Sequence, residues 1–176
     1  MINAYLKAVD KHIVAESTNL GGTRDARHIV NVKASEDIDN GKLVNLTAAK
    51  YEKNEYFTMV EPTAGCRVGL ILSVPIGALE TPYSAKLESN FYNGKNEIMR
   101  VYDLMDMDKF TISANGITAL AEAPVVGNYV KADGYDIAEV AADPSATCGF
   151  VGQIIEKITR SGGVFYKILV RKNREI

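Results

Sequence analysis

A repeated short motif is the feature that most constrains the fold of this chain. Glu61-Pro62-Thr63-Ala64-Gly65-Cys66 precedes Val68-Gly69-Leu70-Ile71, and later Asp143-Pro144-Ser145-Ala146-Thr147-Cys148 precedes Val151-Gly152-Gln153-Ile154. An acid, Pro, Ala, Cys and a Val-Gly pair recur in the same order. We infer that the chain is internally duplicated, the alternative being a chance match of a six-residue core.

The match weakens away from the motif but keeps its order. Residues 40–44 align with 126–130, and residues 29–32 align with 110–113. The alignment predicts a first unit at residues 28–108, which carries an insertion at 75–90, and a second unit at residues 109–176.

Residues 1–27 stand outside the repeat. A short alternating stretch ends near Val14, and periodicity is lost from Ser17 to Thr23. This pattern predicts an N-terminal arm joined to the first unit by a flexible loop.

Most segments between turn signals favour strands. Residues 56–60, 96–102 and 164–170 are rich in β-branched and aromatic residues. Asn-Gly and Asp-Gly pairs supply the positive φ that two-residue hairpin turns need, which favours a meander of antiparallel strands. The pairs include Asn40-Gly41, Asn93-Gly94, Asn115-Gly116 and Asp133-Gly134.

Two further segments have patterns compatible with a helix. Residues 135–142 fit a strand or a helix, and their position opposite residues 56–60 favours a strand. A short helix is predicted from Thr81 to Ser89, with Pro82 at its first position. The predicted fold class is therefore mainly β: two duplicated antiparallel β-units, barrel- or sandwich-like, with an N-terminal arm and at most one short helix.

Composition excludes several classes of partner. The 176 residues carry 20 Lys+Arg against 22 Asp+Glu, so a net charge of −2 offers little attraction to nucleic acid or anionic lipid. The longest apolar run, residues 68–79, is interrupted by Ser73, Pro75 and Gly77 and is shorter than the roughly 20 residues of a membrane span. With two cysteines and no secretory leader pattern, we expect an intracellular product with reduced thiols.

The chain contains no motif for nucleotide binding, for a nucleophile elbow, for a zinc protease or for a Cys-x-x-Cys site. Cys66 and Cys148 have apolar neighbours, which is typical of small buried side chains rather than of nucleophiles. Residues 103–108 collect three carboxylates but lack the order of a calcium loop, so we interpret them as an exposed acidic turn. The sequence thus predicts no enzyme, catalytic residue, cofactor or metal. A small enzyme of unrecognised type is a third hypothesis.

The last strand is basic. It combines Tyr166 with Lys167, Arg171, Lys172 and Arg174, a pattern typical of barrels that bind single-stranded nucleic acid. Charges on an edge strand also prevent edge-to-edge aggregation without any ligand. A small nucleic-acid-binding β-barrel module is therefore kept as the alternative function.

The turn and apolar patterns of residues 38–44, 93–104 and 125–130 carry a family resemblance. Together they resemble the small head proteins of tailed bacteriophages that decorate the outside of the capsid. The resemblance implies a non-enzymatic virion protein, made in the host cytoplasm and located on the capsid surface, where it binds and stabilises the major capsid protein shell. It implies no cofactor, nucleic acid or membrane partner, and it leaves a homo-oligomer open, including a trimer.

The arm supplies the predicted contacts with the shell. Arg24 and Arg27 are the candidate partner-binding residues, because guanidinium groups pair well with carboxylates at interfaces. Exposure for solubility alone is the alternative for both residues.

Overall fold

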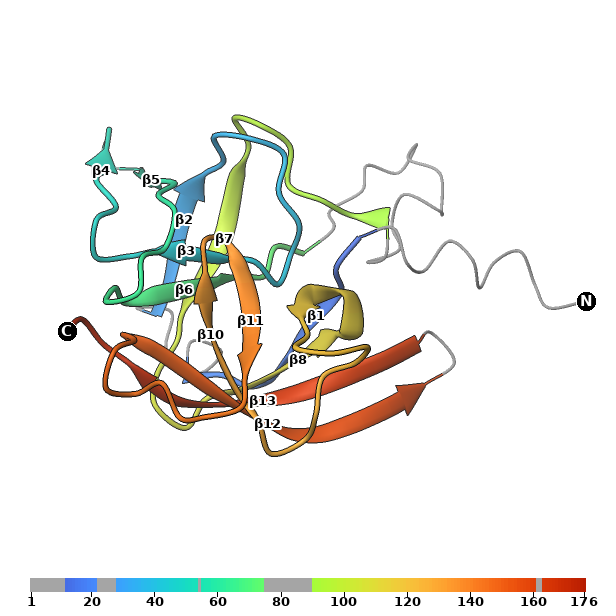
Figure 1. The fold of residues 1–176 in the computed structure, drawn as a ribbon. Helices are drawn as coiled ribbons and strands as arrows, with labels where there is room; N and C mark the ends of the chain where they lie inside the picture. The colour runs from blue at the N-terminus through green and yellow to red at the C-terminus, as the bar shows by residue number, and fades with distance from the viewer. Residues whose placement is uncertain (1–11, 22–27, 54, 75–89, 161–162) are drawn as a thin grey trace, which may run out of the picture.

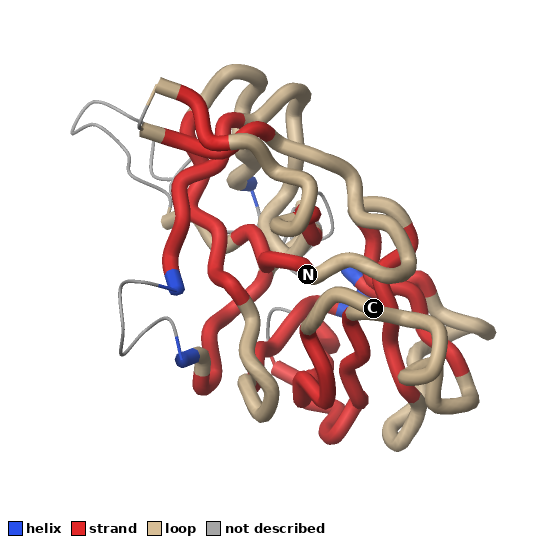
Figure 2. The backbone as a smooth tube through the Cα atoms, turned by 90° about the vertical axis from the view of Figure 1, so that its left-hand side faces the viewer, coloured by secondary structure: helices blue, strands red, loops and turns tan. Residues whose placement is uncertain are grey.

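The computed structural model describes residues 12–21, 28–53, 55–74, 90–160 and 163–176. These residues form two β-sheets, one above the other in Figure 1, and the tube in Figure 2 shows the same two groups of strands from the side. The mainly β fold class predicted from the sequence is confirmed. The predicted helix at 81–89 lies outside the described residues. The described residues contain the 3₁₀ turn η6 (Ala114–Gly116) and no α-helix.

The six-stranded sheet has the order β3-β6-β7-β2-β5-β4. Its neighbours pair antiparallel except β2 and β5, which run parallel. The Asn45 N–H also donates to Val60 O at 2.9 Å, so the chain after β5 returns to β3 and the sheet curls on itself. The strands are β2 (Ile29–Lys33), β3 (Leu43–Asn45), β4 (Tyr51–Glu52), β5 (Tyr56–Thr58), β6 (Val68–Ile71) and β7 (Ile98–Asp103).

The seven-stranded sheet has the order β1-β8-β13-β12-β10-β11-β9. β9 follows β8 after η6 and pairs parallel with β11, so this sheet also bends back toward its first strands. The β12–β13 hairpin is its longest part and runs across the lower half of Figure 1. The strands are β1 (Ala15–Asn19), β8 (Lys109–Ser113), β9 (Ile117–Thr118), β10 (Tyr129–Asp133), β11 (Asp136–Val140), β12 (Phe150–Arg160) and β13 (Gly163–Asn173).

Both sheets contain the same four-strand pattern. The orders β3-β6-β7-β2 and β10-β12-β13-β8 are equivalent in chain order, and every pair in them is antiparallel. Val44 lies opposite Gly69 in the first sheet, and Val130 lies opposite Gly152 in the second. Both cysteines are buried just before the corresponding strands β6 and β12. That the two units superpose throughout stays a prediction.

Hydrogen bonds at the start of each pattern also correspond. In the first unit the Gly41 N–H donates to Ile71 O at 2.9 Å, and the Ile71 N–H donates to Lys42 O at 2.9 Å. In the second unit the Gly127 N–H donates to Ile154 O at 2.8 Å, and the Ile154 N–H donates to Asn128 O at 2.9 Å. These bonds match the alignment of residues 40–44 with 126–130.

The alignment of the first strands needs a shift of one residue. Val30 pairs with Val101, which lies opposite Ile71, whereas Phe110 pairs with Ile168, which lies opposite Ile154. Val30 therefore corresponds to Phe110, where the sequence alignment matched Ile29 to it. Side-chain alternation makes such a shift significant, because one residue moves a side chain to the other face.

The recurring Val-Gly pair has a steric cause. A Cβ built at Gly69 would lie 2.4 Å from Val101 Cγ1, and one built at Gly152 would lie 2.7 Å from both Ile168 Cγ2 and Val130 Cγ2. No real Cβ approaches that closely, so glycine is required where neighbouring strands carry branched side chains on the same face.

The two units share a core. One buried cluster fills the first unit and is made of Val32, Ala34, Ile38, Val44, Met59, Ile71, Met99 and Val101. The larger cluster contains Phe110, Ile112 and Ile154 of the second unit, and it continues to Leu43 and Leu70 of the first. Because one apolar cluster includes side chains of both sheets, the units are expected to stabilise each other.

The N-terminal segment differs from its prediction. Ser17 to Asn19 belong to β1, which pairs antiparallel with β8, so the prediction of a flexible loop is wrong for these residues. Just before β1, the Ile13 N–H donates to Asp39 Oδ2 at 3.2 Å, while Asn115 Nδ2 donates to His12 O at 3.4 Å. Residues 12–19 therefore connect the two units.

The acidic run at residues 103–108 is also not a simple exposed turn. Asp108 is buried and accepts hydrogen bonds from the Gly21 N–H at 2.7 Å and the Met105 N–H at 2.9 Å. Asp106 accepts one from the Asn173 N–H at 3.0 Å. Backbone N–H groups therefore bind both carboxylates, and Asp108 is buried while Asp106 stays exposed.

The turn signals predicted the hairpins only in part. Asp133-Gly134 leads into a tight hairpin in which Asp133 pairs with Asp136 and Gly134 has a φ of 58°. Asn115-Gly116 instead lies in η6, and the two parallel strand pairs do not belong to a meander. The meander is therefore wrong as a description of the whole topology.

We predict that Gly149→Ala destabilises the protein more than Gly152→Ala. A Cβ at Gly149 would lie 2.4 Å from Cys66 O and 2.6 Å from Gly65 O, which are backbone atoms, whereas Gly152 faces side-chain methyl groups that can shift. The expected loss is about 1–3 kcal/mol for Gly152→Ala and more for Gly149→Ala. Urea unfolding measures both.

Gly94→Ala is the matched control for this pair. Its Cβ would lie 3.1 Å from the carboxyl end of the exposed Glu97 side chain, which can shift, so the expected change is within about 0.5 kcal/mol. Equal losses for all three variants would show that close strand packing does not explain the glycines.

Candidate binding surface

A buried carboxylate holds the loop that joins β9 to β10. Glu139 of β11 is 3% exposed, although carboxylates are rarely buried without partners. Its Oε2 accepts the Leu120 N–H at 3.0 Å, and its Oε1 accepts the Val125 N–H at 2.8 Å and Asn128 Nδ2 at 2.7 Å. The carboxylate thus fixes both ends of residues 120–125.

These hydrogen bonds also determine the charge of the group. Burial alone would raise the pKa of the Glu139 carboxyl, but the bonds from Leu120, Val125 and Asn128 outweigh burial and lower the pKa from its usual value. Glu139 is therefore ionised at neutral pH, when it binds its three donors as an anion.

The loop held in this way is apolar and exposed. We call residues 119–127 the Gly127 loop. Leu120 is 60% exposed, Val125 53% and Val126 48%, and Ala121 and Ala123 are exposed between them. Glu122 is the one charged residue in this stretch. Among the described residues, the other large apolar side chains with high exposure are spread over separate segments: Tyr51, Val74, Tyr92, Ile98, Met107 and Ile176.

Order with little apolar burial is the unusual property of the Gly127 loop, in which Pro124 is the one buried residue. Fixing a backbone costs roughly 1–2 kcal/mol per residue, and a buried carboxylate adds a desolvation cost. Loops normally recover such costs by packing their own apolar side chains, but Leu120, Val125 and Val126 face solvent. An exposed and pre-ordered apolar surface is typical of a binding site for another molecule.

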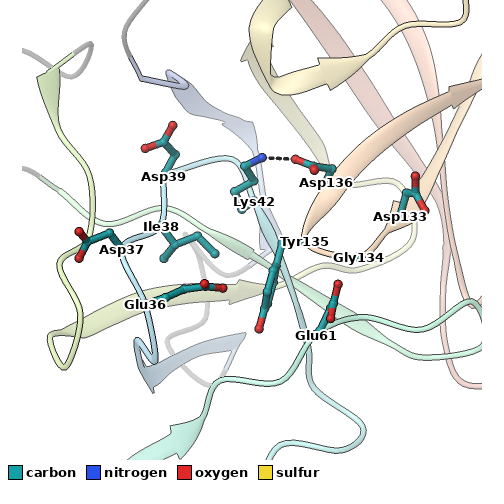
Figure 3. A pocket seen from close by; sticks show the side chains of 10 residues that line it. All are labelled: Glu36, Asp37, Ile38, Asp39, Lys42, Glu61, Asp133, Gly134, Tyr135 and Asp136. Carbon is teal, nitrogen blue, oxygen red and sulfur yellow. Dashed lines mark hydrogen bonds and ion pairs between the residues drawn. The ribbon is translucent and has the colours of Figure 1, made fainter.

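A second candidate is an acidic hollow between the two sheets, with a volume of about 420 Å³. Figure 3 shows its side chains, which come from the loop before β3, from Glu61 and from the tip of the β10–β11 hairpin. Lys42 forms an ion pair with Asp136 across it. The acidic side chains are Glu36, Asp37, Asp39, Glu61, Asp133 and Asp136.

The hollow is also a structural contact. The Leu43 N–H donates to Tyr135 O at 2.8 Å, which joins the hairpin tip to the edge of β3. Figure 3 shows the Tyr135 ring between Glu36 and Glu61; burial, and then these two carboxylates, raise the pKa of its hydroxyl. Among the described residues, no group of three or more His, Cys, Asp or Glu side chains could hold a metal ion.

Both histidines pair with aspartates. His12 Nδ1 lies 2.8 Å from Asp39 Oδ1, and the ring stacks on Tyr92 with 5.3 Å between centroids. His28 Nδ1 lies 3.8 Å from Asp103 Oδ2, which Arg67 contacts at 3.0 Å. Asp39 also accepts the Ile13 N–H, so the first pair holds the N-terminal segment in place.

Cysteine chemistry receives no support from the geometry. Burial raises the pKa of the Cys66 thiol despite a hydrogen bond from Thr63, which disfavours a nucleophilic thiolate.

Burial likewise raises the pKa of Asp103 against the influence of Arg67 and His28, and among the described atoms its Oδ1 has no hydrogen-bond partner.

Two of the basic residues that the sequence singles out on the last strand have partners within the fold. Arg24 and Arg27 lie outside the described residues. On β13, Tyr166 is buried, Lys167 forms an ion pair with Glu156, and Lys172 donates to Ser145 O at 2.7 Å and Cys148 O at 2.9 Å. Tyr166 therefore offers no stacking surface to a base.

Sequence reasoning missed the Gly127 loop and Glu139. The available signals were the run from Ala119 to Val126, which is apolar except for Glu122, and an acid at position 139 inside an otherwise apolar strand. Neither signal shows that the acid and the loop contact each other.

Comparisons with protein-family models, curated proteins and solved structures find no match to this chain. No helix among the described residues is long and apolar enough to cross a membrane.

We predict that Glu139→Ala loosens the Gly127 loop. Leu120 and Val125 would lose a charged acceptor, and the expected loss of stability is about 2–3 kcal/mol. Urea unfolding measures the loss, and hydrogen exchange of the Leu120 and Val125 amides reports the loop itself. Glu122→Ala, an exposed acid in the same loop, should change neither value.

The same contact predicts a pH dependence. Because the folded pKa of Glu139 is lowered, its stabilisation is complete above the usual Glu value of about 4.3 and is lost as the pH falls through the folded pKa. Protection factors of the Leu120 and Val125 amides should stay constant down to that value and then decrease. A decrease that begins well above it would mean that another group controls the loop.

Proposed function

We propose that this chain is a non-enzymatic structural protein of a tailed-bacteriophage virion, which binds the outer surface of the capsid and stabilises the shell. The observation that carries the proposal is the Gly127 loop, because Glu139 orders an exposed apolar surface that its own fold does not bury. The resemblance of residues 38–44, 93–104 and 125–130 to capsid decoration proteins supports the same role.

Pre-ordering makes such a surface suited to a static contact. A loop that is already fixed has less conformational entropy to lose when it meets a partner. The three exposed side chains Leu120, Val125 and Val126 are fewer than the roughly 20–30 residues that each partner contributes to a standard interface. A single contact would be weak, but many copies on a repeating shell, or several loops in one oligomer, would bind with much higher avidity.

Charge favours a protein partner over nucleic acid. The net charge of −2 and the acidic hollow offer little attraction to phosphate. Arg24 and Arg27 remain proposed secondary contacts, since arginine pairs well with the carboxylates of a shell. The alternative function, nucleic-acid binding, would require steeply salt-dependent affinity for single-stranded DNA.

Co-sedimentation with capsids tests the proposal. The full chain would be mixed with undecorated heads of the phage that carries its gene, with single-stranded DNA as the comparison ligand. We expect saturable binding to heads at micromolar concentration and no comparable affinity for DNA. Absence of binding to heads at that concentration, or tighter binding to DNA, would contradict the proposed function.

A further inference from the structure

The two units differ at one equivalent turn. Gly41 and Gly127 both have left-handed backbones, with φ of 83° and 101°, and both make the same paired hydrogen bonds to a following strand. A Cβ built at Gly41 would lie 2.8 Å from Ile13 Cγ2, 2.9 Å from Ile112 Cδ1 and 3.2 Å from Ala15 Cβ. Apart from its two chain neighbours, no described atom lies within 4 Å of one built at Gly127. The first turn is covered and the second is open.

The cover of the first turn has a defined chemistry. Besides Ile112 of β8, it is the aliphatic segment Ile13-Val14-Ala15, whose three side chains are buried. Its backbone is fixed to the second unit, since the Val14 N–H donates to Ser113 Oγ at 3.0 Å and the Ser113 N–H donates to Val14 O at 2.9 Å. A short aliphatic strand held by backbone hydrogen bonds is thus what this kind of turn accepts within the molecule.

We propose that the Gly127 loop is the docking site for a short extended aliphatic segment of the shell subunit, similar in chemistry to residues 13–15. This inference rests on the proposed function and names the part of the partner that is bound. Val125 and Val126 next to the open turn supply the apolar surface, and Leu120 extends it. The equivalent contact inside the molecule is the model for the partner's segment.

The chemistry of the loop selects this kind of segment. A charged segment would lose hydration against Val125 and Val126 without gaining a partner for its charge. The loop carries no basic or aromatic side chain, which are the groups that favour nucleic acid or a membrane interface. Since Glu139 fixes the loop before binding, the site needs little rearrangement to accept a strand.

Single substitutions on the loop test this inference in the full chain. Val126→Asp and Leu120→Asp place a charge on the docking surface and are expected to weaken binding to undecorated heads at least tenfold. Met107→Asp is the matched control, because Met107 is also an exposed apolar residue, at 61%, and its φ of 76° is tolerated by Asp. It should change binding less than twofold.

Glu139→Gln tests the role of loop order separately. An amide keeps the shape of the side chain but presents an N–H₂ to one of the three donors, so the loop should loosen while its apolar residues stay. We expect head binding to weaken several-fold, with an unchanged circular dichroism spectrum. Unchanged affinity for heads would show that the pre-ordered state of the loop does not contribute to binding.

The outcomes separate the inference from the proposed function. If the full chain and both loop variants bind heads equally, the loop is not the docking site but the proposed function stands. If the full chain does not bind, both fail. If the free chain self-associates in sedimentation velocity and Val126→Asp abolishes this, the loop binds a second copy, which overturns the shell segment as its occupant.

Discussion

The paired hydrogen bonds between a left-handed glycine turn and the following apolar strand determine the rest of this structure. Gly41 with Ile71, and Gly127 with Ile154, set the register in which each unit pairs its central strands. In that register Val44 faces Gly69 and Val130 faces Gly152, so the strands approach where no Cβ would fit. A shift of one residue would place branched side chains at these points and reverse the buried faces.

The two units use this common framework differently. In the first, residues 13–15 cover the glycine turn, and Asp39 fixes them through the Ile13 N–H and His12. In the second, three hydrogen bonds to Glu139 order the loop instead of an apolar cover, so Leu120, Val125 and Val126 stay in solvent. An internal contact in one unit thus corresponds to a surface available to a partner in the other.

The sequence predicted the parts of this fold that depend on local chemistry. Apolar and β-branched segments became strands, and glycines with positive φ lie at Gly41 and Gly134 as the turn signals indicated. The repeated Val-Gly pair could be recognised because close strand packing leaves one residue type available.

Contacts between distant residues could not be predicted in this way. β1 is a strand because β8 supplies its hydrogen-bond partners, whereas its own pattern, with Ala15 buried and the following residues polar, resembles a loop. In the sequence, Glu139 resembles an ordinary exposed acid, because its hydrogen-bond donors come from the Gly127 loop only in the folded chain. The same limit explains Asp108, whose acceptor role depends on Gly21, 87 residues away.

We propose that the Gly127 loop, open in the isolated molecule, becomes covered by the shell. Hydroxyl-radical footprinting of the full chain, free and bound to undecorated heads, measures this directly, because oxidation of exposed aliphatic side chains reports their access to solvent. We predict that Leu120, Val125 and Val126 become protected on heads while Met107 keeps its reactivity. Unchanged oxidation of the loop on bound chains, with protection elsewhere, would contradict it.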